Sequence, residues 1–370
     1  MKKKNFKVRI LLCVIFVGIL CLSFIFKNQI ESFLNKDYLA TFEQIEVCDF
    51  KVHYIDVGQA DAIAIEFPNK EKMLIDSGET SSKDALNNYL TNALSWKDDE
   101  KIIDYFLITH PHEDHIGGGV TVFENFQVLN FYRPMVYTKQ ESDEMGGSYY
   151  SSKIFNSVIE ASNEEEGCTT IFFDNSTELV IGDCEIDFLS PTKVKYNNVN
   201  NYSPILRLEY NEKVFIFTGD AEKEIENEVL LNYPVEYLKA DVLKVGHHGS
   251  TTSSCEEFLN AVSPTYSIIS VGADNTYGHP NDKVLNRLKE HGSIIYRTDE
   301  NGNIVVGINK GELLIFVVKN DNIPLKIELW YIVVPLAVGG CYLILTIRIK
   351  KPKGSSKSLN NRKVNKANKK

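Results

Sequence analysis

The sequence predicts an α/β domain that is flanked in the chain by two membrane-spanning helices. Short segments rich in β-branched and aromatic residues alternate with amphipathic helical segments between residues 45 and 320, and this alternation is typical of the α/β class. One uncharged apolar run precedes that region and another follows it. Histidines and aspartates also follow several of the expected strands, so we expect a functional site where those strands end.

The two apolar runs are long enough to span a bilayer. Residues 10–26 carry no charge over 17 positions and residues 329–347 carry none over 19, whereas a membrane helix needs about 17–25 apolar residues. We therefore predict a basic N-terminus with a transmembrane anchor at 1–30 and a second transmembrane helix at 327–348. A cleaved signal peptide and a buried core helix are the respective alternatives, although no small-residue cleavage pattern follows the first run.

Basic residues gather at the two ends of the chain and acidic residues lie between them. Of the 40 Lys and Arg residues, sixteen lie in 1–27 and 348–370, and these ends contain none of the 50 Asp and Glu residues. Because basic flanks stay in the cytoplasm, we expect both ends to be cytoplasmic, with a disordered basic tail at 349–370. The domain at 45–320 then lies outside the cytoplasm at the cell membrane, and its acidity disfavours generic binding of polyanions.

Within that domain the expected strands and helices follow one another along the chain. Residues 50–68 and 72–78 are expected to form a strand hairpin, 81–96 a capped amphipathic helix, and 102–110 a buried strand. The polar, acidic stretch 138–170 is expected to be an insertion or lid that contains a helix. Further strands are expected within residues 177–191, 203–220, 242–250, 266–272, 291–309 and 311–318.

Four cysteines occur in this domain, Cys48, Cys168, Cys184 and Cys255, without a Cys-x-x-Cys pair. Their spacing predicts no zinc site made of thiolates. A domain outside the cytoplasm can form disulfides, and free thiols in the core are an equally supported alternative.

The sequence His110-x-His112-x-Asp114-His115 is a dense group of metal-ligand residue types. It holds three of the eight histidines of the chain and lies between an expected strand and a glycine-rich turn. Imidazoles and carboxylates are ligands of first-row metal ions. On a turn, His110 and His112 can point into one cavity and the Asp114–His115 pair into its other half, as two ions about 3.5–4 Å apart require. A polar loop with incidental histidines is the alternative interpretation.

Two later strand ends carry further candidate ligands. Asp220 follows an apolar run and can bridge two ions through its carboxylate, although an aspartate at such a position can also cap a helix. His247 and His248 end another expected strand. Because neighbouring side chains diverge, we expect one of them to bind metal while the other faces substrate or bonds to a carboxylate.

The three remaining histidines have weaker signals. His279 precedes Pro280 in an expected loop, where a lone histidine is more often a surface residue. His53 and His291 have no ligand-type neighbours that indicate a site, so we interpret them as structural.

These motifs together resemble the metallo-β-lactamase fold. More narrowly, residues 50–318 are similar to the soluble hydrolase domain of ComEC competence proteins, through the segments DVGQADA, HPHEDHIGG, FTGDAEKE, LKVGHHGS and YGHP in this order. The resemblance implies a four-layer αββα sandwich for the domain at 45–320, with the site at one edge of two packed sheets. It also implies hydrolysis, often of a phosphodiester, with two divalent ions, Zn²⁺ or Mn²⁺.

Two departures from this family concern the whole chain and its first motif. Two spans cannot form the multi-helix channel of ComEC-type proteins, so we expect that this chain does not translocate DNA by itself. A separate membrane channel protein is therefore a candidate partner. Ala60 stands where the family usually has glycine, which is a minor change.

A third departure concerns the metal ligands. Many proteins of this fold have another metal-binding histidine between the cluster and the bridging aspartate, but no histidine occurs here between the cluster and His247. We therefore expect the ion held by His110 and His112 to be weakly bound, or to be helped by Asn201, Ser203 or water.

We expect the candidate site residues to have the following roles. His110 and His112 hold one ion, Asp114, His115 and His248 hold the other, and Asp220 bridges them. His248 is preferred to His247 as the ligand. Asp114 also orients the attacking water, and His247 and His279 bind phosphate or protonate the leaving group. The expected nucleophile is a hydroxide that bridges the ions, because bound ions lower the pKa of water from 15.7 towards about 7.

The favoured substrate is a phosphodiester outside the membrane, cleaved by a membrane-anchored phosphodiesterase or nuclease. Extracellular DNA is one candidate. A cell-envelope polymer such as a decorated teichoic acid is another, because zinc phosphorylcholine esterases have motifs of this style. A β-lactam has no support beyond the fold. A non-catalytic, membrane-tethered binding or sensing module with a structural metal site is the remaining alternative.

Overall fold

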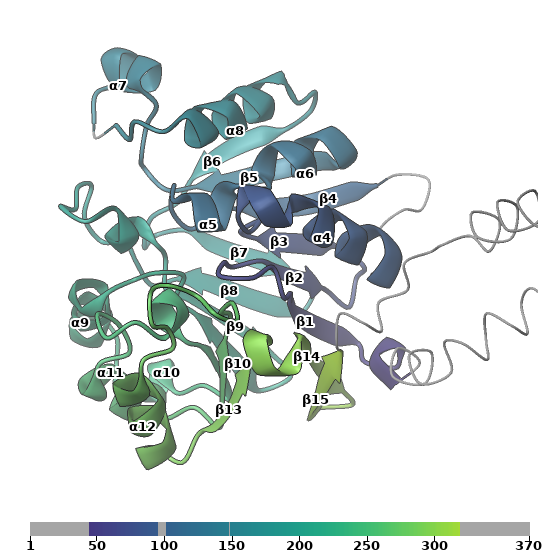
Figure 1. The fold of residues 1–370 in the computed structure, drawn as a ribbon, viewed down its shortest axis with the longest axis vertical. Helices are drawn as coiled ribbons and strands as arrows, with labels where there is room; N and C mark the ends of the chain where they lie inside the picture. The colour runs from purple at the N-terminus through teal and green to yellow at the C-terminus, as the bar shows by residue number, and fades with distance from the viewer. Residues whose placement is uncertain (1–43, 95–100, 148, 319–370) are drawn as a thin grey trace, which may run out of the picture. The chain divides into compact units, whose positions relative to one another are not determined.

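Two β-sheets lie face to face in the domain, with helices on their outer sides (Figure 1). The computed structural model describes residues 44–94, 101–147 and 149–318, which all belong to one unit of the chain, 32–326. The order of strands is β15-β14-β1-β2-β3-β4-β5-β6 in one sheet and β13-β12-β11-β10-β9-β8-β7 in the other. The α/β class with two packed sheets is confirmed.

The first sheet is built from both ends of the domain. Its strands are β1 (Phe50–Tyr54), β2 (Ile63–Glu66), β3 (Lys72–Ile75), β4 (Ile102–Leu107), β5 (Gln127–Arg133), β6 (Thr169–Phe172), β14 (Asn303–Asn309) and β15 (Glu312–Val318). Strands β3 to β6 pair in parallel, whereas β1, β2, β14 and β15 pair antiparallel. The C-terminal ends of β3 and β4 therefore meet at one edge of the sheet.

The second sheet also has a parallel part and an antiparallel part. Its strands are β7 (Glu178–Ile181), β8 (Cys184–Phe188), β9 (Leu206–Tyr210), β10 (Lys213–Phe217), β11 (Val242–Lys244), β12 (Tyr266–Ile269) and β13 (Ile294–Arg297). Strands β10 to β13 pair in parallel and β7 to β10 antiparallel. The ends of β10 and β11 thus also lie at a common edge.

Helices cover the outer side of each sheet. The first sheet carries α4 (Lys83–Asn88), α5 (Glu113–Ile116), α6 (Gly119–Asn125) and α8 (Lys153–Glu164), and the second carries α9 (Lys223–Asn232), α10 (Val235–Leu238), α11 (Glu256–Val262) and α12 (Asp282–Glu290) (Figure 1). Two further short helices are α7 (Lys139–Met145) and α13 (Thr298–Asn301). The layers follow the expected order of helices, sheet, sheet and helices.

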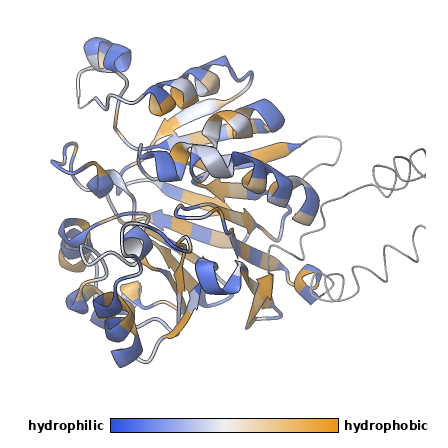
Figure 2. Ribbon diagram, viewed as in Figure 1, coloured by the Kyte–Doolittle hydropathy of each residue, from blue (hydrophilic) through white to orange (hydrophobic). Residues whose placement is uncertain are grey.

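The alternation of side chains along each strand creates the two cores. On β10, Phe215 and Phe217 lie in the apolar cluster between the sheets, whereas Ile216 lies in the cluster beneath the helices. On β2, Ile63 and Ile65 face the inner cluster in the same way. Figure 2 shows the result, with apolar strands inside and helices that carry one polar face. Strands buried on both faces need apolar residues at nearly every position.

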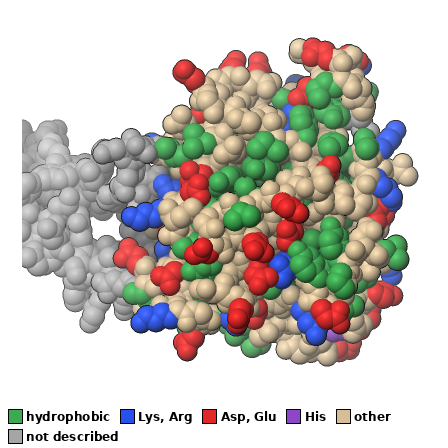
Figure 3. All heavy atoms as spheres, turned by 180° about the vertical axis from the view of Figure 1, so that it is seen from behind, with side chains coloured by type: hydrophobic (Ala, Val, Ile, Leu, Met, Phe, Trp, Pro, Cys, Tyr) green, Lys and Arg blue, Asp and Glu red, His purple; other side chains and the backbone are tan. Residues whose placement is uncertain are grey.

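The surface seen from behind carries charges of both signs. Figure 3 shows acidic, basic and apolar side chains mixed over the described part of this face, with no large patch of Lys and Arg. This distribution suits the excess of acidic residues between the basic ends of the chain.

The expected helix at 81–96 has three parts instead of one. A 3-10 turn (Thr80–Ser82) leads into α4, and a π turn (Tyr89–Ala93) follows it. The hydroxyl of Thr91 donates to the Asn87 carbonyl oxygen at 2.6 Å, and such bonds compete with regular helix geometry. The Tyr89 hydroxyl lies 3.0 Å from His53 Nδ1. His53 is buried there, as its structural interpretation requires.

The segment 138–170 contains the expected helix, but that helix is not part of a lid. Helix α8 buries Phe155, Val158 and Ile159 and packs against α5 and α6, so it belongs to the outer helical layer. Helix α7 buries no residue. It is held by the Arg133 guanidinium, which donates two hydrogen bonds to Glu141 at 2.7 and 3.0 Å. The exposed face of α8 carries polar residues such as Asn156, Glu160 and Asn163.

The cysteines of the domain are all free thiols: Cys48, Cys168, Cys184 and Cys255. Of the two alternatives for these residues, the structure therefore shows free thiols.

The predicted membrane segments lie outside the described residues, together with the boundaries 1–30, 327–348 and 349–370. Among the residues that are described, no helix is long and apolar enough to cross a bilayer.

The different packing of α7 and α8 can be tested with one substitution in each. Phe155 is fully buried and Met145 is 59% exposed. We expect Phe155→Ala to lower the free energy of unfolding by about 3–5 kcal/mol, because it leaves a cavity. Met145→Ala should change it by less than about 0.5 kcal/mol. Chemical denaturation measures both, and equal effects would show that α8 is not part of the core.

Candidate metal centre

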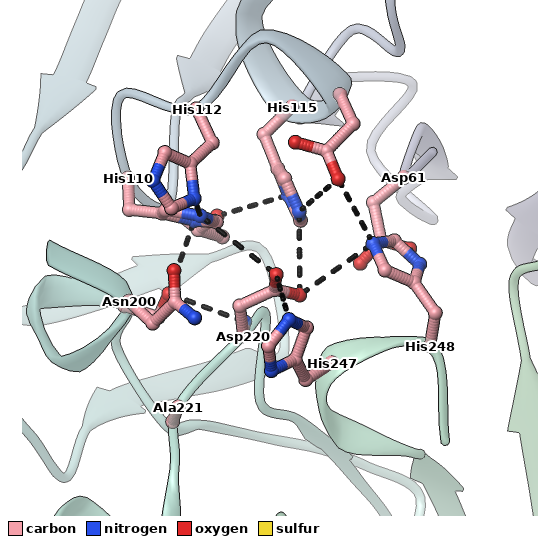
Figure 4. A network of polar contacts seen from close by, with 12 residues as sticks. Asp61, His110, His112, His115, Asn200, Asp220, Ala221, His247 and His248 are labelled. Carbon is pink, nitrogen blue, oxygen red and sulfur yellow. Dashed lines mark hydrogen bonds and ion pairs between the residues drawn. The ribbon is translucent and has the colours of Figure 1, made fainter. Parts of the chain in front are cut away.

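The candidate ligands come together where parallel strands of the two sheets end. His110 follows β4, Asp220 follows β10, and His247 and His248 follow β11. Figure 4 shows these side chains converging on the carboxylate of Asp220. Gly219 makes this approach possible, because it has a φ of +48° and a Cβ there would lie 3.0 Å from Thr109 Cβ.

One group of donors lies on the Oδ2 side of Asp220. His110 Nε2 is 3.8 Å from this oxygen and 3.0 Å from His112 Nδ1. Donor atoms of His110, His112 and Asp220 all lie within 4.8 Å of one another, so these residues could hold one metal ion.

A second group lies on the Oδ1 side of Asp220. His115 Nε2 is 3.3 Å and His248 Nε2 is 3.7 Å from this oxygen. His248 Nε2 is also 3.4 Å from Asp114 Oδ2. Asp114, His115, Asp220 and His248 could therefore hold a second ion. Asp220 contributes one oxygen to each group, which is the arrangement that a bridging carboxylate requires.

Buried atoms without hydrogen bonds support this interpretation. Asp220 Oδ1, His115 Nε2 and His248 Nε2 are buried, and none makes a hydrogen bond with another residue that the structure describes. Buried polar atoms in proteins normally have a partner. Three unpaired donors that converge on one point match the ligand chemistry of a first-row divalent ion. The residues at this site thus fit the metal that their pattern predicts.

Two buried aspartates orient the histidines from behind. Asp76 Oδ2 lies 2.7 Å from His115 Nδ1, and Thr109 donates to both oxygens of Asp76. The Nδ1 of His248 lies 2.9 Å from the carbonyl oxygen of Ser270 and 3.3 Å from Asp61 Oδ1. Such partners fix which ring nitrogen faces the metal. Here they direct both Nε2 atoms to the centre.

The sequence interpretation missed Asp76 and Asp61 as members of the site. Asp76 ends the apolar segment KMLID, and a carboxylate at a strand end was a usable signal. Asp61 lies in the DVGQADA segment, which supported the resemblance but suggested no role for this residue.

Adjacent histidines reach the same carboxylate through an unusual turn. His247 and His248 have φ values of 50° and 52°. The left-handed conformation costs a non-glycine residue roughly 1–2 kcal/mol, and such strain is typical of functional sites. His247 Nε2 lies 3.5 Å from Asp220 Oδ2, whereas His248 Nε2 lies 3.7 Å from Asp220 Oδ1. His248 thus belongs to the second group of donors, whereas His247 lies outside both groups, with its Nδ1 3.7 Å from Glu222 Oε1.

The loop that carries His279 packs directly on this turn. A Cβ on Gly249 would lie 2.6 Å from the Cβ of Pro280, and Asn281 N donates to the Gly249 carbonyl oxygen at 2.9 Å. The His279 ring centroid is 5.7 Å from that of His247. His279 thus lies beside the site rather than within either group of donors.

Asn201 and Ser203, the expected helpers of the first ion, have other partners. Ser203 Oγ lies behind His110, 3.2 Å from Nδ1. Asn201 accepts from Glu222 N and donates to Glu224.

The two groups differ in their electrostatics. Burial lowers the pKa of His110 well below its ordinary value and also lowers that of His112. Burial opposes charge on His115 as well, but the carboxylates of Asp220, Asp76 and Asp114 outweigh it and raise the His115 pKa well above its ordinary value. For the same reason the pKa of His248 rises to about 10. A cation that binds the second group must therefore displace protons, because only neutral imidazole binds metal.

A buried ion pair supports the second group. Lys244 Nζ lies 2.7 Å from Asp61 Oδ2, and Lys244 is the only buried lysine among the described residues. Burial opposes ionisation of Asp61, but Lys244 and His248 hold its pKa below the usual range. The pair joins the loop after β1 of one sheet to β11 of the other.

Comparison with known proteins gives the family context of this geometry. A profile of the metallo-β-lactamase superfamily matches residues 55–273, which is more than half of the chain. ComE operon protein 3 of Bacillus subtilis is 34% identical over 266 residues, which cover 69% of this chain and 32% of that protein. Competence protein ComA of Neisseria gonorrhoeae is 34% identical over 182 residues, which cover 48% of this chain and 25% of that protein. The aligned part is thus a third or less of each relative.

Among solved structures, the fold is similar to that of the metallo-β-lactamase fold protein YhfI from Bacillus subtilis. The TM-score is 0.44 with 12% sequence identity, and the match covers 72% of this chain and 99% of that one.

The importance of the buried ion pair can be measured directly. Lys244→Met leaves the Asp61 carboxylate buried without its cation, and breaking such a pair costs about 3–5 kcal/mol. We expect the free energy of unfolding to fall by that amount. Lys139→Met is the matched control, because Lys139 pairs with Asp143 at the surface and its loss should leave stability unchanged. An unchanged stability of Lys244→Met would contradict a supporting role for the pair.

Proposed function

This chain belongs to the metallo-β-lactamase superfamily and is a hydrolase of that family, and we propose that it cleaves phosphodiester bonds outside the cytoplasm while anchored in the cell membrane. The observation that carries the proposal is the position of Asp220, whose two carboxylate oxygens serve two separate groups of donors. Two ions held in this way are suited to in-line displacement at phosphorus. The anchor and the topology rest on the apolar runs and their basic flanks.

In this proposal His110 and His112 bind the first ion, and Asp114, His115 and His248 bind the second. Asp220 bridges the two. When bound, the ions lower the pKa of a water molecule and draw charge from the phosphate oxygens. Both Zn²⁺ and Mn²⁺ suit this mixture of imidazole and carboxylate donors.

The remaining side chains act on water and on the substrate. Asp114 is 35% exposed, so one carboxylate can contact the second ion and also orient the attacking water. His279 lies at the border of the site next to His247, where it can donate a hydrogen bond to a phosphate oxygen or a proton to the leaving group. Burial and the neighbouring His247 and His248 lower the His279 pKa, which favours the neutral, hydrogen-bonding role.

The resemblance to ComEC competence proteins makes DNA the first candidate substrate, and two relatives are named ComE operon protein 3 and competence protein ComA. The alignments span a third or less of these proteins. A separate channel protein is a proposed partner for any role in DNA uptake. A cell-envelope phosphodiester with cationic groups, as in a phosphorylcholine-esterase-like reaction, is the second candidate. The acidic residues between the basic ends favour a cationic substituent over a polyanion.

The Asp220→Ala variant tests the core of the proposal. We expect it to lose bound metal and to hydrolyse bis-(p-nitrophenyl) phosphate no faster than the uncatalysed background, because both donor groups lose a shared ligand. Elemental analysis and a colorimetric assay give the two results. His291→Gln serves as the control, since His291 pairs with Glu256 away from the site. Wild-type protein that binds two ions but cleaves no phosphodiester would favour an ester or amide substrate, and one that neither binds metal nor cleaves would favour the binding module.

The role of His279 can be resolved with two kinds of leaving group. A hydrogen bond to a charged group contributes about 1.5–3 kcal/mol, so we expect His279→Ala to lower kcat/KM by about 10- to 100-fold. The loss should be equal for p-nitrophenyl and alkyl phosphodiesters if His279 binds phosphate. A much larger loss with the alkyl substrate, whose leaving group needs a proton, would instead identify His279 as the general acid.

A further inference from the structure

The two groups of donors at the centre are unequal in number. The second group offers donors from four residues, whereas the first offers them from His110, His112 and Asp220 alone. Protein sites for Zn²⁺ or Mn²⁺ hold the ion with about four or more donors, some of which can be water or substrate. The first group is also the one for which the sequence lacks a further histidine. A donor that replaces this histidine should be buried, polar and unpaired.

Asn200 has these properties. It lies in the 3-10 turn (Val199–Tyr202) that precedes β9 and is 5% exposed. Its Oδ1 atom is buried and makes no hydrogen bond with any residue within the described ranges. Figure 4 shows its carboxamide next to His110, on the side of the centre where the first group lies.

The hydrogen bonds of Asn200 determine which end of the amide faces the centre. Its Nδ2 donates to Glu222 Oε1 at 3.3 Å. A carboxylate only accepts hydrogen bonds, so the amide nitrogen must be on the side of Glu222 and the oxygen on the opposite side. The turn itself is fixed, since the Asn200 backbone nitrogen donates to Asn198 Oδ1 at 3.1 Å and its carbonyl oxygen accepts from Ser203 N at 2.9 Å.

We propose that Asn200 Oδ1 is a ligand of the ion held by His110, His112 and Asp220, in place of the missing histidine. The inference rests on the proposed function, because it completes the same centre. Glu222 is then a positioning residue, since its Oε1 also lies 3.7 Å from His247 Nδ1 and so connects Asn200 with His247. No other side chain of this turn is available, because Asn201 and Ser203 have partners of their own.

The proposal has a consequence for metal selectivity. An amide oxygen is a harder ligand than an imidazole nitrogen, and oxygen ligands suit Mn²⁺ better than imidazole does. The first site of this chain should therefore discriminate less against Mn²⁺ than a site with three histidines. Restoring a histidine should shift the preference towards Zn²⁺.

Calorimetric titration of the metal-free full-length chain with Mn²⁺ and with Zn²⁺ tests the assignment. We expect two bound ions in the wild type. In Asn200→Ala one of the two dissociation constants should rise at least tenfold while the other stays the same. In Asn200→His the affinity of that site for Zn²⁺ should increase relative to Mn²⁺. Thermal unfolding of each metal-free variant shows whether the fold is intact.

Asn130→Ala is the matched control, because it makes the same chemical change on β5, where the Asn130 side chain donates to the Asp104 carbonyl oxygen at 3.0 Å. It should leave both metal affinities unchanged. Wild-type affinities for both ions in Asn200→Ala would overturn the assignment, even if turnover supports the proposed function. A wild-type chain that binds no ion would overturn the proposed function together with this inference.

Discussion

The carboxylate of Asp220 is the element on which the rest of the centre depends. It is buried at the end of β10 and lies between donors from both sheets. Its position requires glycine before it, and its backbone nitrogen donates to Ser203 Oγ at 3.2 Å. Each oxygen faces different histidines, so its orientation sets the separation of the two donor groups. A sandwich of two sheets provides this geometry because the ends of β4, β10 and β11 meet at one edge.

Four carboxylates lie close together at this edge and repel one another, and the fold separates them into two pairs. Asp114 and Asp220 face the centre, whereas Asp76 and Asp61 stand behind the histidines. Buried charges of one sign destabilise a protein unless they have partners. Lys244 neutralises Asp61, and protonated histidines or cations must neutralise the others. The stability of this edge is therefore linked to the occupancy of the centre.

The sequence predicted those parts of the site that are local in the chain. His110, His112, Asp114 and His115 were recognisable because ligand types recur within six positions. Asp220 and His248 were recognisable because each follows an apolar strand. Resemblance to a known family then supplied the sandwich. These signals need only short-range patterns, which a single sequence displays.

The remaining features depend on contacts between distant segments. Lys244 and Asp61 are ordinary residue types whose pairing appears only when the two sheets pack. Asn200 was overlooked beside Asn201, because nothing in the sequence indicates which amide of the turn points inward. The positive φ values of His247 and His248 have no signal in the sequence, and the turn that they form directs the two side chains to different oxygens of Asp220. The stretch 138–170 was interpreted as an insertion or lid because polar residues dominate its composition, and the apolar face with which α8 joins the outer layer did not stand out.

The packing of Gly249 against Pro280 couples the movement of two loops, the turn that carries His248 and the loop that carries His279. The turn that supplies His248 and the loop that supplies His279 share a hydrogen bond and have no room for a Cβ between them. A change in the second loop that alters contact with substrate would therefore also disturb the metal ligand. Helix α7 is not coupled to a ligand in this way, because it buries no residue and is held through the ion pair of Glu141 with Arg133.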